Sequence, residues 1–171
     1  FRQTTARLPW LLIGMLGGIG NSMILGNFDS TFAAHPEMAL YIPLIGGTGG
    51  NVGTQSSALV VQGLANSSLD ANNTWKQILK ESVVALINAT IISMLVYVYN
   101  FIRFGATATV SYSVSLSLFA VVMFASIFGT LVPMTLEKMK IDPAIATGPF
   151  ISITNDIIGM LLYMGITVML S

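Results

Sequence analysis

The sequence predicts an all-α integral membrane protein, and its composition and charge pattern lead to that prediction. Of the 171 residues, 54% are hydrophobic and 8% are charged, and the mean hydropathy is +0.79. Soluble domains carry about 25% charged residues. The few charges here are concentrated in short segments between long apolar stretches. We therefore expect lipid, rather than water, to cover most of the surface.

Five apolar stretches are long enough to cross a hydrocarbon core of about 30 Å, which takes roughly 20 helical residues. We expect one membrane domain over residues 1–171, with transmembrane helices at about 9–25, 41–65, 78–102, 113–136 and 144–170. Turn-forming and charged residues separate these stretches. The chain begins at Phe1 without the features of a signal peptide, so we expect a fragment whose upstream part is missing.

The distribution of lysine and arginine predicts the orientation in the cell membrane. With five spans, all but one of the basic residues fall on the same side of the membrane: Arg2, Arg7, Lys76, Lys80, Lys138 and Lys140. Only Arg103 falls on the other side. Because basic residues favour the cytoplasmic side, we expect a cytoplasmic N-terminus and an extracytoplasmic C-terminus at Ser171.

Several function classes are disfavoured by the same inventory. The formal net charge is zero and the seven basic residues are scattered, which argues against nucleic acid as a partner. The chain has no cysteine, so disulfides and thiolate metal sites are excluded. An intramembrane enzyme would need a nucleophile with a base or a metal-binding cluster, and the single histidine, His35, lies in a predicted loop. We therefore expect no enzyme.

Asp156 is the most informative residue, because it lies near the middle of the last predicted span. An ionised carboxylate at that depth costs about 2.5 to 3.5 kcal/mol on insertion scales, which predicts a watery cavity or a cation beside it. Small and polar residues share or border its helix face: Gly148, Pro149, Ser152, Asn155 and Gly159. In the alternative interpretation Asp156 is protonated or hydrogen-bonded and only holds the helices together.

The second predicted span contains the run Gly46-Gly47-Thr48-Gly49-Gly50-Asn51-Val52-Gly53-Thr54-Gln55. Each glycine weakens a helix by about 1 kcal/mol relative to alanine, so the run needs a compensating reason. Its small-xxx-small spacing indicates close packing of helices. Packing does not explain why Asn51 and Gln55 lie one turn apart, whereas amide oxygens can face a hydrated cation.

Magnesium fits this set of oxygen donors. It prefers oxygen ligands and keeps several waters, so its sites use one or two carboxylates. Softer metals would require cysteine or several histidines. Glu81, about one turn inside the third predicted span, is a candidate for a second ion site, although we favour a structural role for it. The sequence leaves selectivity among Mg²⁺, Mn²⁺, Co²⁺, Ni²⁺ and Ca²⁺ open.

Two long motifs in this order resemble the MgtE family of magnesium transporters. The second span is similar to the family signature from Pro43 through the glycine run to Gln55. The fifth span resembles the family's last helix, whose intramembrane aspartate binds magnesium, through Asp142-Pro143-Ala144, Gly148-Pro149, Thr154-Asn155-Asp156 and Gly159. The pair Lys80-Glu81 also matches the family pattern. The likeness covers essentially the whole chain.

The resemblance implies a homodimer of ten helices, with the pore between the second and fifth helices of both subunits. Asp156 would be the pore ligand from each subunit. The implied metal and pore-lining residues are, besides Asp156, Asn51, Gly148, Ser152 and Asn155, and then Gly47, Gly50, Gln55, Pro149 and Gly159. The family's cytosolic N-terminal and CBS domains are not represented before Phe1, and Gln62 stands where the family often has a basic residue.

We therefore expect passive, voltage-driven Mg²⁺ uptake, with a second copy, lipid and Mg²⁺ as partners. Two alternatives stay open. A coupled transporter would exchange H⁺ or Na⁺, with Asp156 carrying the proton. A non-conducting membrane assembly protein would need only the glycine spacings for packing.

Overall fold

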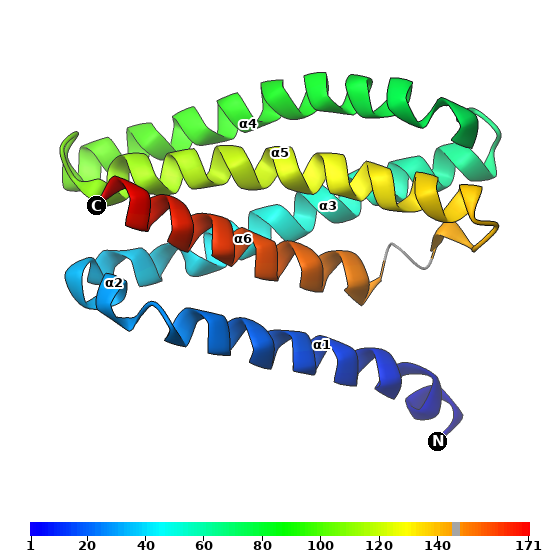
Figure 1. The fold of residues 1–171 in the computed structure, drawn as a ribbon, viewed down its shortest axis with the longest axis horizontal. Helices are drawn as coiled ribbons and strands as arrows, with labels where there is room; N and C mark the ends of the chain where they lie inside the picture. Colours follow the sequence, from blue (N-terminus) through cyan, green and yellow to red (C-terminus); the bar gives the residue numbers. More distant parts are fainter. Residues whose placement is uncertain (145–147) are drawn as a thin grey trace.

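The computed structural model describes residues 1–144 and 148–171 and consists of long helices (Figure 1). The five long helices are α1 (Arg2–Gly26), α3 (Ile42–Ala65), α4 (Thr74–Phe104), α5 (Thr109–Lys138) and α6 (Pro149–Leu170). A short helix, α2 (Asp29–Ala34), and two 3₁₀ segments, η1 (Pro36–Tyr41) and η2 (Ala71–Asn73), lie in the connections. The described residues contain no strand, which confirms the all-α fold class.

Four of the long helices, α1, α4, α5 and α6, are long and apolar enough to cross a membrane in the described part of the chain. The remaining helix, α3, has 24 residues and is therefore about 36 Å long. Its length is sufficient, but glycines and amides interrupt its apolar residues at positions 46–55, and it is not among these four candidate spans. The membrane class is confirmed, and the count of five spans stays a prediction.

The helices begin and end at different residues from those predicted. α1 starts at Arg2 instead of residue 9 and contains Pro9, and α4 and α5 each start four residues early. The prediction that the last helix starts at residue 144 is wrong, because α6 starts at Pro149. Gly148 before it is extended (φ −93°, ψ −155°), as expected for a residue that precedes proline. Residues 145–147 of that predicted span lie outside the described residues.

α5 is the central helix of the bundle. It packs against α4, α3 and α6, and it contributes Val114, Leu118 and Val121 to the buried core. α1 packs mainly on α6, where a Cβ atom at Gly17 would lie 2.5 Å from Ile153 Cγ2. None of the 25 residues of α1 is buried. The bundle therefore has a packed centre of α3, α5 and α6, with α1 and α4 on its outside (Figure 1).

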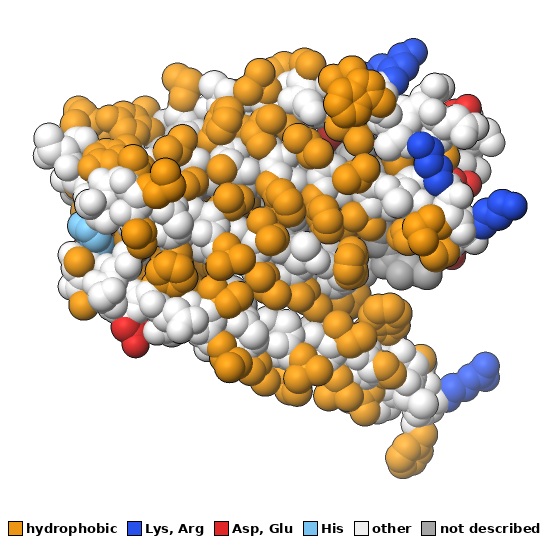
Figure 2. All heavy atoms as spheres, in the orientation of Figure 1, with side chains coloured by type: hydrophobic (Ala, Val, Ile, Leu, Met, Phe, Trp, Pro, Cys, Tyr) orange, Lys and Arg blue, Asp and Glu red, His pale blue; other side chains and the backbone are white. Residues whose placement is uncertain are grey.

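The basic residues gather at one end of the bundle. The N-terminus, the α3–α4 connection and the α5–α6 connection lie together at the right in Figure 1. The six basic residues predicted to share a side lie in these segments or in the helix turns next to them. Figure 2 shows the visible Lys and Arg side chains at that end and hydrophobic side chains along the rest of the face. Arg103, near the end of α4, lies at the opposite end.

At the end of the bundle away from the basic residues, buried hydrogen bonds join the connection before α3 to the neighbouring helices. The Tyr163 hydroxyl donates to the Met38 carbonyl oxygen at 2.8 Å, and the Tyr41 hydroxyl donates to Asn100 Oδ1. Both tyrosines are buried. These bonds join η1 to α6 and α4, so they fix where α3 begins. In the same connection, His35 Nδ1 lies 3.8 Å from Glu37 Oε1.

We expect Tyr163→Phe to lower the free energy of unfolding by about 1 kcal/mol, because the Met38 carbonyl then loses its buried donor. Thermal unfolding in detergent, followed by tryptophan fluorescence, measures the change. Tyr112→Phe is the control, since Tyr112 is only half-buried. Equal destabilisation by the two substitutions would contradict this role of the Tyr163 hydroxyl.

The placement of the connections at the two ends of the bundle predicts from which side of the membrane single introduced cysteines can be labelled. The chain has no cysteine of its own, so only the introduced residue reacts. A membrane-impermeant maleimide is expected to react with Asn72→Cys and Met139→Cys from one side. It should react with Ala106→Cys, in the α4–α5 connection, from the other side. Reaction of the Asn72 and Met139 variants from different sides would refute the arrangement of five spans.

Candidate ion-binding site

The glycine run of α3 packs directly against α6 at Asn155 and Asp156. A Cβ atom at Gly46 would lie 3.5 Å from Asp156 Oδ1, which is an ordinary contact. At Gly53 it would lie only 2.0 Å from Asn155 Nδ2. The structure therefore brings together the two motifs that the sequence singled out, and Gly53 accommodates the side chain of Asn155.

α5 closes this contact from another direction. A Cβ atom at Gly129 would lie 2.6 Å from the Gly53 carbonyl oxygen, and one at Gly49 would lie 2.8 Å from Val121 Cγ1. Real Cβ atoms do not approach other atoms so closely. Glycine is therefore required at position 129, where the neighbour is backbone, and a side chain at position 49 would displace Val121. Close backbone approach at small residues is how helices associate in lipid. The crossing of α3, α5 and α6 is thus fixed at Gly53 and Gly129.

Asp156 is half-buried on α6, about 10 Å along that helix from its start. Its Oδ1 atom faces the Gly46 position of α3, as described above. The described residues contain no group of three or more His, Asp or Glu that could hold a metal ion. Among the described residues of one chain, Asp156 therefore belongs to no such cluster, which suits an ion that keeps most of its water.

Asn155 faces a different direction from its neighbour. Its side chain is 1% exposed, and neither its Oδ1 nor its Nδ2 atom has a hydrogen-bond partner in the described part of the chain. Successive residues of a helix point about 100° apart, so Asn155 enters the contact with Gly53 while Asp156 faces Gly46. In one chain the two predicted ligands do not share a site.

Asn51 and Gln55 lie on an exposed face of α3, which we call the polar face. Its exposed members recur at helical spacing: Gly47, Asn51, Gln55, Ala58 and Gln62. Five residues separate Gly46 from Asn51, which places them about 140° apart around the helix axis. One chain therefore does not bring the Asn51 amide to the Asp156 carboxylate.

The remaining predicted site residues are either half-buried or buried in the core of the single chain. Gly50 and Ser152 are half-buried, as are Gly148 and Pro149 at the start of α6. Gly159 is buried, and a Cβ atom there would lie 3.8 Å from side-chain atoms of both Ile45 and Val121. Gly159 is therefore in contact with the core within one chain.

Glu81 accepts a hydrogen bond from Ser56 Oγ at 2.8 Å, which joins α4 to α3. This contact supports the structural role that the sequence favoured. Sequence reasoning missed Ser56, although a signal was present. Gly49, Gly53, Ser56 and Val60 recur at helical spacing and form the buried face of α3.

Comparison with known proteins decides the family. Residues 42–166 match the MgtE family model, which is described as a divalent cation transporter. The chain belongs to the MgtE family. The matched region extends from the start of α3 into the last turns of α6, so it contains the glycine run and Asp156. Membership of a transporter family agrees with the expectation that the chain is not an enzyme.

Three MgtE relatives, each named magnesium transporter MgtE, are similar to nearly the whole chain. The proteins from Bacillus subtilis and Thermus thermophilus are each 33% identical to it over 94% of its length. The protein from Enterococcus faecalis is 29% identical over 98%. The matched regions are 35% to 37% of the relatives, so the chain spans about a third of their length.

We expect Gly53→Ala to destabilise the fold by about 1 to 3 kcal/mol, because the added Cβ overlaps the Asn155 side chain. Gly50→Ala is the matched control, since nothing lies within 4 Å of its Cβ position. Denaturant unfolding in detergent compares the two. Combining Gly53→Ala with Asn155→Ala should recover a large part of the loss, and strictly additive effects would disprove the contact.

Proposed function

We propose that the chain is a membrane domain through which Mg²⁺ crosses, with Asp156 as the carboxylate that meets the ion. The observation that carries this proposal is the half-buried Asp156 side chain against the Gly46 surface of α3. A carboxylate inside the bundle is costly in lipid unless water or a cation accompanies it. Family membership and the names of the relatives support a divalent cation, and magnesium in particular.

The polar face of α3 supports a second copy of the chain as the partner. Asn51, Gln55 and Gln62 are exposed in the single chain, and lipid offers no hydrogen bonds to their amides. A water-filled path lined by two copies supplies those hydrogen bonds. We therefore place the pore between α3 and α6 of both subunits, in agreement with the homodimer that the resemblance implies.

A homodimer would bring two Asp156 carboxylates to one path, and their combined charge balances that of one Mg²⁺ ion. Mg²⁺ dehydrates reluctantly, so the carboxylates would contact a largely hydrated ion, with Asn51 and the backbone of the glycine run beside its water shell. The membrane potential favours entry of a divalent ion by about 4.6 kcal/mol per 100 mV, twice the value for a single charge. Passive uptake therefore needs no coupled reaction.

Coupled exchange with H⁺ remains the second candidate, because Asp156 is itself a titratable group inside the bundle. The two mechanisms respond differently to imposed gradients. A membrane potential alone drives the passive route. A coupled exchanger requires a pH gradient and moves protons in proportion to Mg²⁺.

The chain reconstituted in liposomes tests the proposal through Mg²⁺ uptake driven by an imposed potential. We expect Asp156→Asn to reduce uptake to the level of empty liposomes, because the carboxylates no longer offset partial dehydration of the ion. Asp70→Asn is the control, since Asp70 is exposed and an asparagine side chain can still accept the hydrogen bond from the backbone N–H of Asn72.

Equal uptake by the Asp156 and Asp70 variants would show that Asp156 only packs the helices. Uptake that depends on a pH gradient, with no response to potential, would favour the coupled exchanger. A normal unfolding temperature of Asp156→Asn is needed to separate loss of transport from loss of fold.

A further inference from the structure

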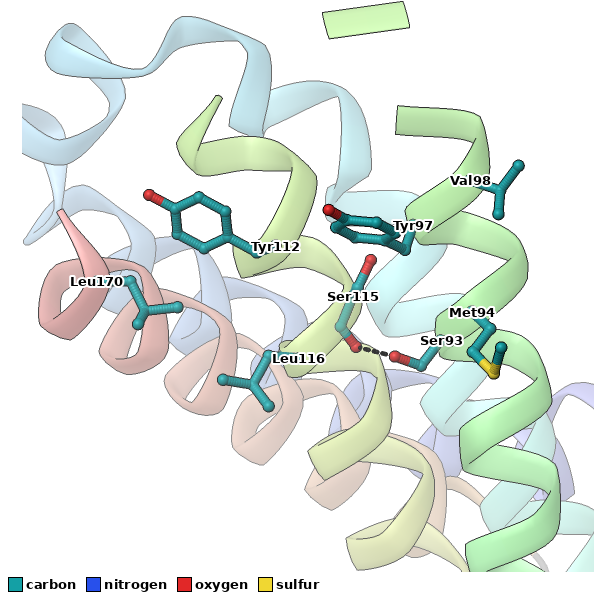
Figure 3. A pocket seen from close by; sticks show the side chains of 8 residues that line it. All are labelled: Ser93, Met94, Tyr97, Val98, Tyr112, Ser115, Leu116 and Leu170. Atoms are coloured by element: carbon teal, nitrogen blue, oxygen red, sulfur yellow. Dashed lines mark hydrogen bonds between the residues drawn. The ribbon is translucent and has the colours of Figure 1, made fainter. Parts of the chain in front are cut away.

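We propose that a groove between α4 and α5 binds the acyl chain of a membrane phospholipid, at a distance from the ion path. The groove has a volume of about 480 Å³. Met94 and Val98 of α4 line one side, Leu116 of α5 lines the other, and Leu170 of α6 lies beyond Leu116 on that side (Figure 3). Pockets of about 300 to 1,000 Å³ hold small organic ligands.

The floor of the groove requires an apolar occupant. Ser93 Oγ donates a hydrogen bond to the Ser115 carbonyl oxygen at 2.8 Å, across the groove in Figure 3. Ser115 Oγ in turn donates to the Ser111 carbonyl oxygen at 3.0 Å. Both serine hydroxyl protons are thus already engaged within the protein. The floor therefore has no hydroxyl proton left to donate to a ligand. The walls of the groove are formed by hydrocarbon side chains.

The depth of the groove identifies lipid as the source of that occupant. α4 has 31 residues and is therefore about 46 Å long, so it extends about 8 Å beyond a 30 Å hydrocarbon core at each end. Tyr97 lies about 10 Å from the end of α4, close to the boundary of that core. Tyr112 lies in the first turn of α5, at headgroup depth. The groove therefore opens toward the part of the acyl chains that lies next to the headgroups.

The two tyrosines suit the ester region of a phospholipid. Tyrosine is enriched at the membrane interface, because its ring is apolar and its hydroxyl can reach polar groups. In Figure 3 both rings lie at the same end of the groove, above Leu116 and Met94. A lipid whose ester group lies near the hydroxyls would place its hydrocarbon chain along the apolar walls.

The rim of the groove fits a flexible chain better than a helix of a second copy. Helices pair in membranes at small residues, which let their backbones approach. The rim carries Met94, Val98 and Leu116, whose side chains are 63%, 54% and 48% exposed. None of the three is a small residue of the kind at which backbones approach, whereas an acyl chain can fit between their side chains.

Photolabelling of the chain in phosphatidylcholine vesicles tests the proposal. A small fraction of the lipid carries a diazirine near the ester end of one acyl chain, and mass spectrometry locates the label. We expect Met94, Val98 and Leu116 to be labelled several-fold more than Leu95 and Tyr99 of α4, which are 67% and 52% exposed at a similar depth but do not line the groove.

Leu116→Trp should fill the groove and lower this labelling several-fold. Leu86→Trp is the matched control, because Leu86 is 50% exposed and does not line the groove. Even labelling along α4 in the unmodified chain would overturn the proposal, as would equal effects of the two substitutions. Weak lipid labelling together with cross-links between chains from a photoreactive side chain at position 94 would show that a second copy fills the groove.

Discussion

The close approach of α3, α5 and α6 at Gly53 and Gly129 is the contact on which the rest of the bundle depends. Lipid tails are as apolar as leucine, so burial of apolar surface gives little drive for helices to associate in a membrane. Backbone contact through glycines supplies dispersion contacts in its place. Because Asn155 fits only against Gly53, this crossing also fixes the rotation of α6, and with it the direction in which Asp156 points.

Hydropathy was sufficient to predict the existence of the long helices, because a backbone in lipid must satisfy its hydrogen bonds internally. It could not place their ends. Arg2 and Arg7 continue α1 beyond the apolar stretch, where water can solvate their charges, and an apolar window does not register such extensions. The start of α6 depended instead on a local rule, since proline at position 149 disfavours helix at Gly148.

The sequence was sufficient to identify Asp156 as a site residue, but not to predict which neighbouring helix each polar side chain faces. Asp156 is conspicuous because an acid inside an apolar helix is costly. Spacing along each helix separates Asn155 from Asp156 and Asn51 from Gly46. Which of these residues faces which neighbour depends on how three helices rotate against each other, and spacing along one helix does not determine that rotation. The bond from Ser56 to Glu81 likewise joins two helices whose register the sequence alone leaves open.

The attachment of α1 has a mechanical consequence. This helix packs mainly on α6, and Gly17 of α1 accommodates the side chain of Ile153 there. Ile153 lies less than one helical turn before Asp156. A displacement of α1 would therefore act first on α6, the helix that carries the carboxylate, whereas α3 packs against α5. The outermost attachment of the bundle is thus made close to the carboxylate that faces Gly46 of α3.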